Sequence, residues 1–250
     1  MVSAYAAANK LVLGQIKTDA KSNEITAIPE LLALLDIKGC LVSIDAMGCQ
    51  TEIAETILQQ GGDYLLAVKG NQPKLFEAVR QALAPLAATP LCAETMTLEK
   101  AHGRIDGREY HVMAAGELAA QFPHWKQLHS IGVAISYRVE NMQKITIEQR
   151  YFISSKALVQ DEFARAVRGH WAIENSLHWV LDVTMGEDDC PIYRGDAAEI
   201  LACIRHMGLN MLRAETSRKA SVRRKQKIAG MSSEYLETVL NAGLKKLGEI

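Results

Sequence analysis

The sequence predicts a mixed α/β fold, with a β-rich insertion and a helical C-terminal region. Three observations lead to this prediction. Short apolar runs alternate with amphipathic segments over the first 86 residues, strand-like segments dominate residues 93–153, and helical periodicity dominates from residue 158 onward. Such an alternation of strands and helices is typical of a partly parallel sheet covered by helices.

The first part of the chain is predicted to run β-β-α-β-α-β-α. Asn9 and Lys10 separate two apolar runs, which predicts a tight hairpin because asparagine tolerates positive φ. Pro29 and Pro73 stand near predicted helix starts, where proline is tolerated. The predicted strands are 2–8, 11–17, 40–46 and 64–69, and the predicted helices are about 28–37, 50–60 and 72–86.

The rest of the chain is predicted to be first β-rich and then helical. One short helix near 116–122 interrupts the strand-like segments, and longer helices follow at about 160–182, 195–213 and 232–246. The predicted domains are a first core part at 1–88, a β-rich insertion at 89–156, closing core helices at 157–214 and a basic helical tail at 215–250.

The composition is that of a globular protein. Hydrophobic residues make up 48% and charged residues 23% of the 250, which excludes collagen-like, low-complexity and disordered classes. No apolar run is long enough for a membrane span, and the start lacks the basic region of a signal peptide. Five cysteines without a CxxC pair predict reduced thiols and a cytoplasmic location. A net charge of −1 gives the whole chain no bias toward nucleic acid.

Asp45 is the first candidate functional residue. It ends a short apolar run of the buried-strand type, and functional sites of α/β sheets lie beyond the carboxyl ends of such strands. Small Ala46 and Gly48 follow it. The simpler interpretation is an aspartate that caps the next turn or helix, and taken by itself this interpretation is favoured.

Glu174 is the second candidate. On a helical projection it falls in the middle of an apolar stripe, and a carboxylate there is costly unless it is paired, hydrogen-bonded or bound to metal. A structural network with a histidine or a buried arginine and a functional carboxylate are equally compatible with this position. His170 and His178, one turn to either side, also leave a weak zinc interpretation open. The apolar positions of the stripe are Phe163, Val167, Trp171, Leu177 and Leu181.

The two carboxylates together favour a magnesium site. Asp45 and Glu174 are far apart in sequence, on a strand end and a helix face, and Mg²⁺ prefers oxygen ligands of this kind. A pair of such ions can activate an attacking oxygen and stabilise a leaving oxygen in phosphoryl transfer.

Three further segments carry charge that could serve binding. The loop from Lys69 to Gln72 opens a helix and suits a phosphate, although an ordinary β-to-α turn is the favoured interpretation when the loop is taken by itself. The acidic run 187–189 is best interpreted as a solvated loop. Between 205 and 227 only Glu215 opposes a set of basic residues, which predicts a backbone-binding surface for DNA or RNA or a solvated helix end. This set is Arg205, Arg213, Arg218, Lys219, Arg223, Arg224, Lys225 and Lys227.

Four strings of the sequence resemble the DDE transposases of bacterial insertion sequences, in particular the H-repeat-associated group linked to Rhs elements. The resemblance covers essentially the whole chain. The strings are SIDAMGCQTEIAETILQQGGDYLLAVKGNQ, RYFISS, RGHWAIENSLHWVLDVTMGEDDC and RGDAAEILACIRHMGLNMLR.

This resemblance implies a fold, an activity and a set of roles. The fold would be RNase H-like with a β-rich insertion, and the activity would be Mg²⁺-dependent cleavage and strand transfer on DNA, with Mn²⁺ as a substitute. Asp45 and Glu174 would be catalytic and hold the metal. The partners would be element ends and target DNA, with a homodimer in the active complex and no membrane. Support of DNA or of the active site would come from Lys69, Asn71, His170, Asn175, His178, Arg205, Arg213, Arg223 and Arg224.

The sequence departs from the family at two points. Related transposases often have an arginine four residues before the glutamate, where this sequence has His170, and the more important departure is a missing residue. The family's first catalytic aspartate lies in a motif of the Ile-Asp-Gly-Lys type on the first core strand, and these 250 residues contain no such motif. The chain is therefore expected to be a C-terminal fragment with little strand cleavage of its own, and to leave unpaired strand edges in the sheet. The alternatives are a catalytically dead DNA-binding remnant and an RNase H-like nuclease.

Overall fold

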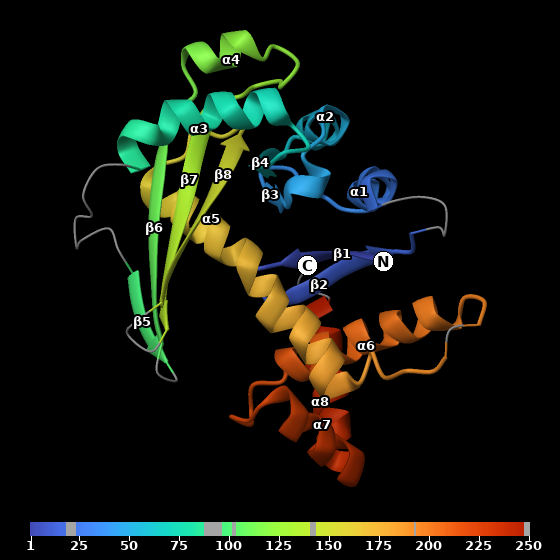
Figure 1. The fold of residues 1–250 in the computed structure, drawn as a ribbon. Coiled ribbons are helices and arrows are strands. Elements are labelled where there is room, and N and C mark those ends of the chain that lie inside the picture. Colours follow the sequence, from blue (N-terminus) through green and yellow to red (C-terminus); the bar gives the residue numbers. More distant parts are fainter. Residues whose placement is uncertain (19–23, 88–96, 102–103, 141–143, 193, 248–250) are drawn as a thin grey trace. The chain divides into compact units, whose positions relative to one another are not determined.

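The chain folds into two compact units, each of which is described by itself (Figure 1). The computed structural model describes residues 1–18, 24–87, 97–101, 104–140, 144–192 and 194–247. We name Lys21–His170 the sheet unit, and Met1–Ala20 together with Trp171–Ile250 the helical unit. The domain boundaries predicted from the sequence stay predictions.

A six-stranded sheet is the centre of the sheet unit, in the order β3-β4-β8-β7-β6-β5. Only β3 and β4 are parallel, and α2 provides the crossover that a parallel pair requires. All other neighbours are antiparallel, and β8 pairs directly with β4, so the strands of the predicted insertion continue the core sheet. The strands are β3 (Leu41–Ile44), β4 (Asp63–Val68), β5 (Thr97–Ala101), β6 (Arg104–Ala114), β7 (Ser130–Glu140) and β8 (Lys144–Ser154).

Helices pack on the two faces of this sheet (Figure 1). On one face α5 contributes Phe163 and Val167, which pack with Leu65 and Phe152. On the other face α3 packs against β6, β7 and β8, and its Phe76 makes an edge contact with Tyr151 at 5.4 Å between ring centroids. The helices that begin in this unit are α1 (Glu24–Ala33), α2 (Thr51–Gln59), α3 (Pro73–Ala87), α4 (Glu117–Gln121) and α5 (Gln160–Ile173).

The helical unit joins the start of the chain to its last third. A hairpin of β1 (Val2–Ala6) and β2 (Leu11–Ile16) packs on helices through Val12, Leu177, Leu181 and Leu209. The side-chain amide of Asn210 both donates to and accepts from the main chain of Val12, at 2.8 Å and 2.9 Å, as a neighbouring strand would. The helical elements are the π-helical turns Glu174–His178 and Val180–Thr184, α6 (Ala197–Ala214), α7 (Val222–Met231) and α8 (Ser233–Leu247).

The predicted fold class is confirmed. The chain is mixed α/β, with a mixed sheet flanked by helices and a helical C-terminal region, which is consistent with an RNase H-like transposase fold. The short helix near 116–122 and the buried stripe of the Glu174 helix at Phe163, Val167, Leu177 and Leu181 are also found. None of the helices in the described part of the chain is long and apolar enough to cross a membrane.

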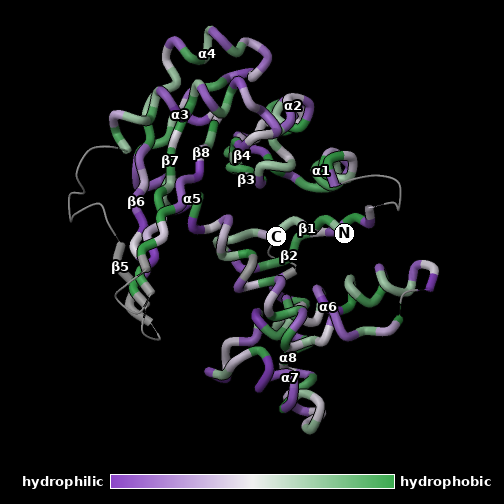
Figure 2. The backbone as a smooth tube through the Cα atoms, in the orientation of Figure 1, coloured by the Kyte–Doolittle hydropathy of each residue, from purple (hydrophilic) through white to green (hydrophobic). Residues whose placement is uncertain are grey.

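Three local predictions are corrected. In the first hairpin the residue with positive φ is Lys10, at 55°, and not Asn9, because the turn is wider than the tight type. The first helix begins at Glu24, so Pro29 lies inside it rather than in its first turn. The tail predicted to be helical from 215 to 250 contains two helices, and the first of them, the basic α7, lies outside the predicted bounds of 232–246, with its basic residues in the hydrophilic colour of Figure 2.

Candidate active site

Asp45 stands at the carboxyl end of β3, where the chain leaves the sheet. It is exposed, its backbone is extended, and its side chain accepts a hydrogen bond of 3.1 Å from the main-chain N–H of Met47. Asp45 therefore caps the 3₁₀ turn Ala46–Gly48, which is the simpler role that the sequence allowed. An exposed carboxylate held by one main-chain donor is also a suitable oxygen ligand for a divalent cation.

Gly48 explains why the turn after Asp45 can lie so close to the strand. A Cβ atom at this position would stand 2.3 Å from Ile44 Cγ2 and 3.1 Å from Ile28 Cδ1. Only glycine fits this approach without a shift of both neighbours. Cys49 follows and is fully buried, and this burial raises the pKa of its thiol to about 12.

Two side-chain amides connect this turn to the loop after β4. Asn71 Nδ2 donates to the carbonyl of Ala46 at 2.6 Å, and Gln72 Nε2 donates to the carbonyl of Cys49 at 3.0 Å. Lys69 is exposed at the start of the same loop. The loop that the sequence presented as a phosphate site thus supports the position of Asp45 through Asn71.

His170 is brought to the strand that carries Asp45. Its Nδ1 lies 3.2 Å from the hydroxyl oxygen of Ser43, and either atom can be the donor, depending on the tautomer of the imidazole. Ser43 is two residues before Asp45, and alternate residues of a strand point to one face. His170 therefore lies on the Asp45 face of the sheet. No local sequence pattern points to Ser43.

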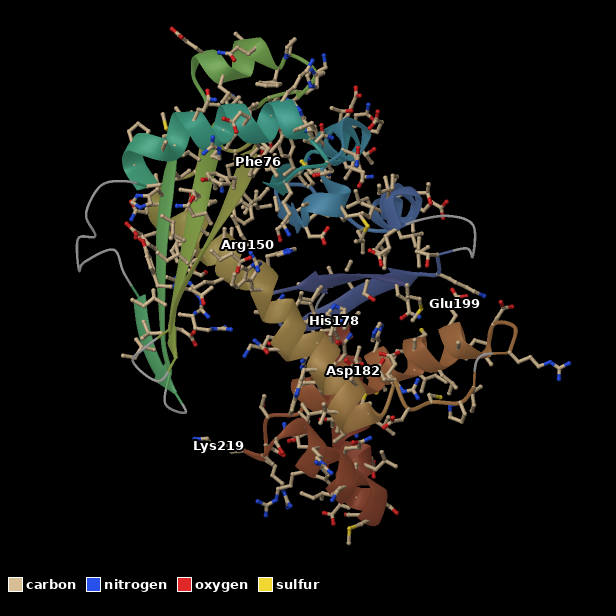
Figure 3. The ribbon with its side chains drawn as sticks, in the orientation of Figure 1. Phe76, Arg150, His178, Asp182, Glu199 and Lys219 are labelled. Atoms are coloured by element: carbon tan, nitrogen blue, oxygen red, sulfur yellow. The ribbon has the colours of Figure 1, made fainter. Side chains whose placement is uncertain are left out.

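Glu174 begins the first π-helical turn of the helical unit. Its side chain lies outside the described residues, so the predicted metal ligation and the predicted structural network both stay predictions. The turn itself is notable because π-helical turns inside α-helices are frequent at functional sites. Asn175 and His178 of this turn are exposed, and Figure 3 labels His178 and Asp182 along the same helical segment.

Arg213 supports the main chain of this turn. Its guanidinium donates to the carbonyl of Lys10 at 2.8 Å and to the carbonyl of Ser176, and it lies 5.7 Å from the centroid of the Tyr5 ring. A planar guanidinium with several donors is suited to such simultaneous contacts. Arg213 therefore connects the first hairpin, α6 and the turn that begins at Glu174.

The other basic residues of the predicted binding run differ in exposure. Lys225 is buried and paired with Glu215 at 3.2 Å, whereas Arg223 and Arg224 of α7 are exposed. Arg205 is half-buried, and its hydrogen bond to Cys190 lowers the pKa of that thiol.

Several titratable groups of the helical unit are partly or fully buried, which the sequence did not indicate. His206 is buried, and this burial, reinforced by His178, lowers the pKa of its imidazole. Burial also raises the pKa of Glu187 in the acidic loop. Glu215 is almost fully buried and accepts hydrogen bonds from Ser217, Arg218 and Tyr235. The burial of these groups arises from the packing of elements distant in sequence, which local sequence patterns do not reveal.

The candidate residues therefore fall into two groups. The sheet unit holds Asp45, with His170 on the same face of the sheet and with Lys69 and Asn71 on the loop after β4, and the helical unit holds the rest. Among the residues that the structure describes, no cluster of three or more histidine, cysteine or acidic side chains has the arrangement of a metal site. The candidates of the helical unit are Glu174, Asn175, His178, Arg205, Arg213, Arg223 and Arg224.

Comparison with known proteins adds the family. The sequence model of the family described as "Transposase DDE domain" matches residues 1–211. The chain is 48% identical over 246 residues to "Putative protein YbfL" and 47% identical over 246 residues to "H repeat-associated putative transposase YhhI", both of Escherichia coli strain K12. These alignments cover 96% of this chain and 65% of each relative, so the chain spans about two thirds of their length. The chain belongs to the family of transposases with a DDE domain.

Proposed function

We propose that this chain contains most of the catalytic domain of an insertion-sequence transposase that cleaves and joins DNA at element ends. The match of residues 1–211 to the transposase domain carries this proposal. The supporting geometry is an exposed Asp45 at a strand end, on a turn that Asn71 and Gln72 hold in place.

Asp45 and Glu174 would hold divalent metal, with Mg²⁺ as the physiological ion and Mn²⁺ as a substitute. When bound, the metal polarises a phosphodiester and lowers the pKa of the attacking water. Asp45 contributes an anionic oxygen that is already oriented by the Met47 N–H, and Asn71 keeps the turn in place while the substrate binds. His170 lies close enough to the Asp45 strand to bind a phosphate oxygen or to shuttle a proton.

We further propose that these 250 residues by themselves cleave DNA negligibly. The resemblance implies three catalytic carboxylates, and this sequence supplies two of them, Asp45 and Glu174. Each missing anionic ligand leaves more of the dehydration cost of the metal unbalanced. Binding without cleavage would be the activity of the chain, through the exposed cations of α7 among others. A homodimer and a cytoplasmic location also belong to this proposal.

The experiment combines DNA binding, cleavage and metal binding. Labelled duplexes that carry the element ends are incubated with the chain and with Mg²⁺ or Mn²⁺, and the products are separated on a denaturing gel. We expect salt-dependent binding without nicking. Nicking that is lost in both Asp45→Asn and Glu174→Gln would contradict the proposed inactivity and show a working metal site. Cleavage without joining would favour the nuclease alternative.

Binding of Mn²⁺, followed by electron paramagnetic resonance, tests the metal ligand directly. Asp45→Asn should weaken Mn²⁺ binding because it removes an anionic ligand. Asp36→Asn is a matched control, since Asp36 is also exposed and also accepts a main-chain hydrogen bond, from Lys38 at 3.2 Å. Equal Mn²⁺ binding by the two variants would exclude Asp45 as a ligand.

A further inference from the structure

We propose that one face of the six-stranded sheet is a binding surface for the sugar-phosphate backbone of duplex DNA. We name it the arginine face and define it as Lys69, Arg108, Arg138, Arg150 and Arg168. The proposal rests on the proposed function, and it names the surface along which the DNA would reach Asp45.

The strand register places Asp45 and the arginines on the same face. Ala67 pairs with Phe152, and both belong to the core that α5 covers on this face. Because alternate residues of a strand share a face, Arg150 lies on the face of Phe152 and Lys69 follows on the side of Ala67. Asp45 follows Ser43 in extended backbone on this same face, where Ser43 contacts His170 of α5.

The long strands of the insertion continue this face away from Asp45. Tyr110 pairs with Ala134 and Ala134 with Arg150, so these three residues form one row across β6, β7 and β8. Arg108 lies two residues before Tyr110 on β6, and Arg138 lies four residues after Ala134 on β7. Both are an even number of residues away, so they point to the same side of the sheet. Arg168 of α5 lies over the Tyr110 ring, 5.8 Å from its centroid.

The distribution of cations over the two faces is one-sided. Alternate residues of β6, β7 and β8 point to the α3 face, and none of these residues is a lysine or arginine. They are every second residue from Ile105 to Met113, from Ile131 to Val139 and from Ile145 to Ile153. Several positions of the α3 face, such as Val133, Ile135 and Ile153, are buried, and this burial keeps cations away from that face. The cations of these strands are therefore gathered on the arginine face, where their positive field favours an anionic partner.

Most of these cations are in contact with solvent, and two of them are paired with carboxylates of the neighbouring strand positions. The Arg138 side chain is 52% exposed and lies 3.1 Å from Asp106, and the Arg150 side chain is 32% exposed and lies 2.7 Å from Glu148. Lys69 and Arg168 are exposed as well. The Arg138 guanidinium and the Glu148 carboxylate are in contact with water, and pairs with such a partner contribute little, so a phosphate can compete for these guanidinium groups.

The extent of the surface fits a short stretch of nucleic acid. From β4 through β8 and β7 to β6 it crosses three strand spacings, or about 15 Å. A DNA strand carries one phosphate per ~3.4 Å of helix axis, so about four phosphates fit this length. The arginine face can therefore neutralise a small number of phosphates next to Asp45.

The test measures how DNA binding depends on salt. Fluorescence anisotropy with a labelled short duplex of mixed sequence gives the affinity of the full chain at several KCl concentrations. In the variant Arg108→Gln/Arg138→Gln/Arg150→Gln we expect the slope of log affinity against log salt to become shallower by about 2 to 3, since each phosphate contact contributes about 0.9. The triple Arg→Lys variant should keep most of the slope, because it keeps the charges.

Arg80→Gln is the matched control. Arg80 lies on α3, on the opposite side of the sheet, and its side chain is 50% exposed and paired with Glu77 at 2.8 Å. Its removal should leave the salt slope unchanged. Thermal melting of each variant shows whether it is folded, and if the triple variant is not, Arg138→Gln alone should make the slope shallower by about 1.

The outcomes separate this inference from the proposed function. A triple variant that binds DNA as tightly and with the same salt slope as the wild type overturns the arginine face and leaves the transposase proposal intact. A wild-type chain without salt-dependent DNA binding overturns both. A control variant that loses as much slope as the triple variant would also overturn the inference, because the effect would then reflect net charge.

Discussion

The side-chain amide of Asn71 donates a hydrogen bond of 2.6 Å to the main-chain carbonyl of Ala46, the residue directly after Asp45. This contact spans 25 positions of the sequence and connects the loops that follow two parallel strands, β3 and β4. The position of Asp45 therefore depends on a neutral side-chain amide, which acts as a hydrogen-bond donor to the main chain.

Replacement of Asn71 should loosen the turn after Asp45. The variant Asn71→Ala removes a hydrogen bond of about 1 kcal/mol, which corresponds to about fivefold more frequent local opening. The buried thiol of Cys49 reports this opening, so its alkylation by iodoacetamide, measured by peptide mass spectrometry, should accelerate about fivefold. The exposed Cys40 is the internal control and should react at an unchanged rate. Unchanged protection of Cys49 would show that Asn71 does not hold the turn.

Gly48 and Gly70 should respond differently to the same substitution. Gly48→Ala places a methyl group 2.3 Å from Ile44 Cγ2, and overpacking of this kind costs about 1–3 kcal/mol. Gly70→Ala meets nothing within 4 Å and should be almost neutral. Urea denaturation of both variants measures the difference. Equal stability of the two variants would mean that the turn is not as closely packed as the structure shows.

Glu215 should make the helical unit sensitive to acid. Burial disfavours its charge, but hydrogen bonds from Ser217, Tyr235 and Lys225 outweigh this and lower the pKa of Glu215 to about 2. A carboxylate with a lowered pKa stabilises the fold above its unfolded pKa of 4.5, and this contribution is lost as the pH falls from about 4.5 toward 2. Denaturation curves at a series of pH values should show this loss in the wild type.

Glu215→Gln should remove that pH dependence and also destabilise the unit at neutral pH. The substitution removes the carboxylate from the buried ammonium of Lys225, which keeps only its contacts with the main-chain carbonyls of Leu212 and Glu215, and the loss of the counter-charge costs about 3 kcal/mol or more. Glu215→Gln/Lys225→Met should recover part of the stability, because it removes the unpaired charge. A single variant as stable as the wild type at neutral pH would contradict the importance of the pair.

His206 should give a second, separate pH effect nearer neutrality. Burial and the neighbouring His178 lower the pKa of its imidazole, so the unfolded chain binds a proton more readily than the folded one. The fold should therefore lose stability as the pH falls below about 6.5, the ordinary histidine value. His206→Gln should flatten this part of the curve. Titration of the imidazole by NMR gives the pKa directly, and a value above 6.5 would refute the assignment.

Local patterns in the sequence were sufficient for most elements of the fold. Alternating apolar runs and glycine stops located β3, α2, β4 and α3, and helical periodicity located the buried positions Phe163 and Leu181. Element ends were less predictable where two local signals competed. Pro29 suggested a helix start, yet the helix begins at Glu24, because a single proline inside a helix is tolerated when tertiary packing supplies the stability.

The candidate site was less accessible to sequence reasoning, because its supporting contacts are tertiary. The strand-end position of Asp45 was visible from the apolar run before it, but the partnership of Ser43 with His170 spans 127 positions. The basic C-terminal run looked uniform as a string, whereas in the structure Lys225 is buried with Glu215 and Arg223 is exposed. Charge counts cannot separate a structural cation from a binding cation.

The contacts of Arg213 give the first hairpin a role that its small size does not suggest. One guanidinium holds a carbonyl of the hairpin, at Lys10, and a carbonyl of the π-helical turn, at Ser176. Loss of the hairpin would leave this cation half-satisfied and would release the helical turn that begins at Glu174. The first sixteen residues therefore help to fix the position of the π-helical turn that begins at Glu174. We expect the hairpin and this turn to unfold in a single cooperative step.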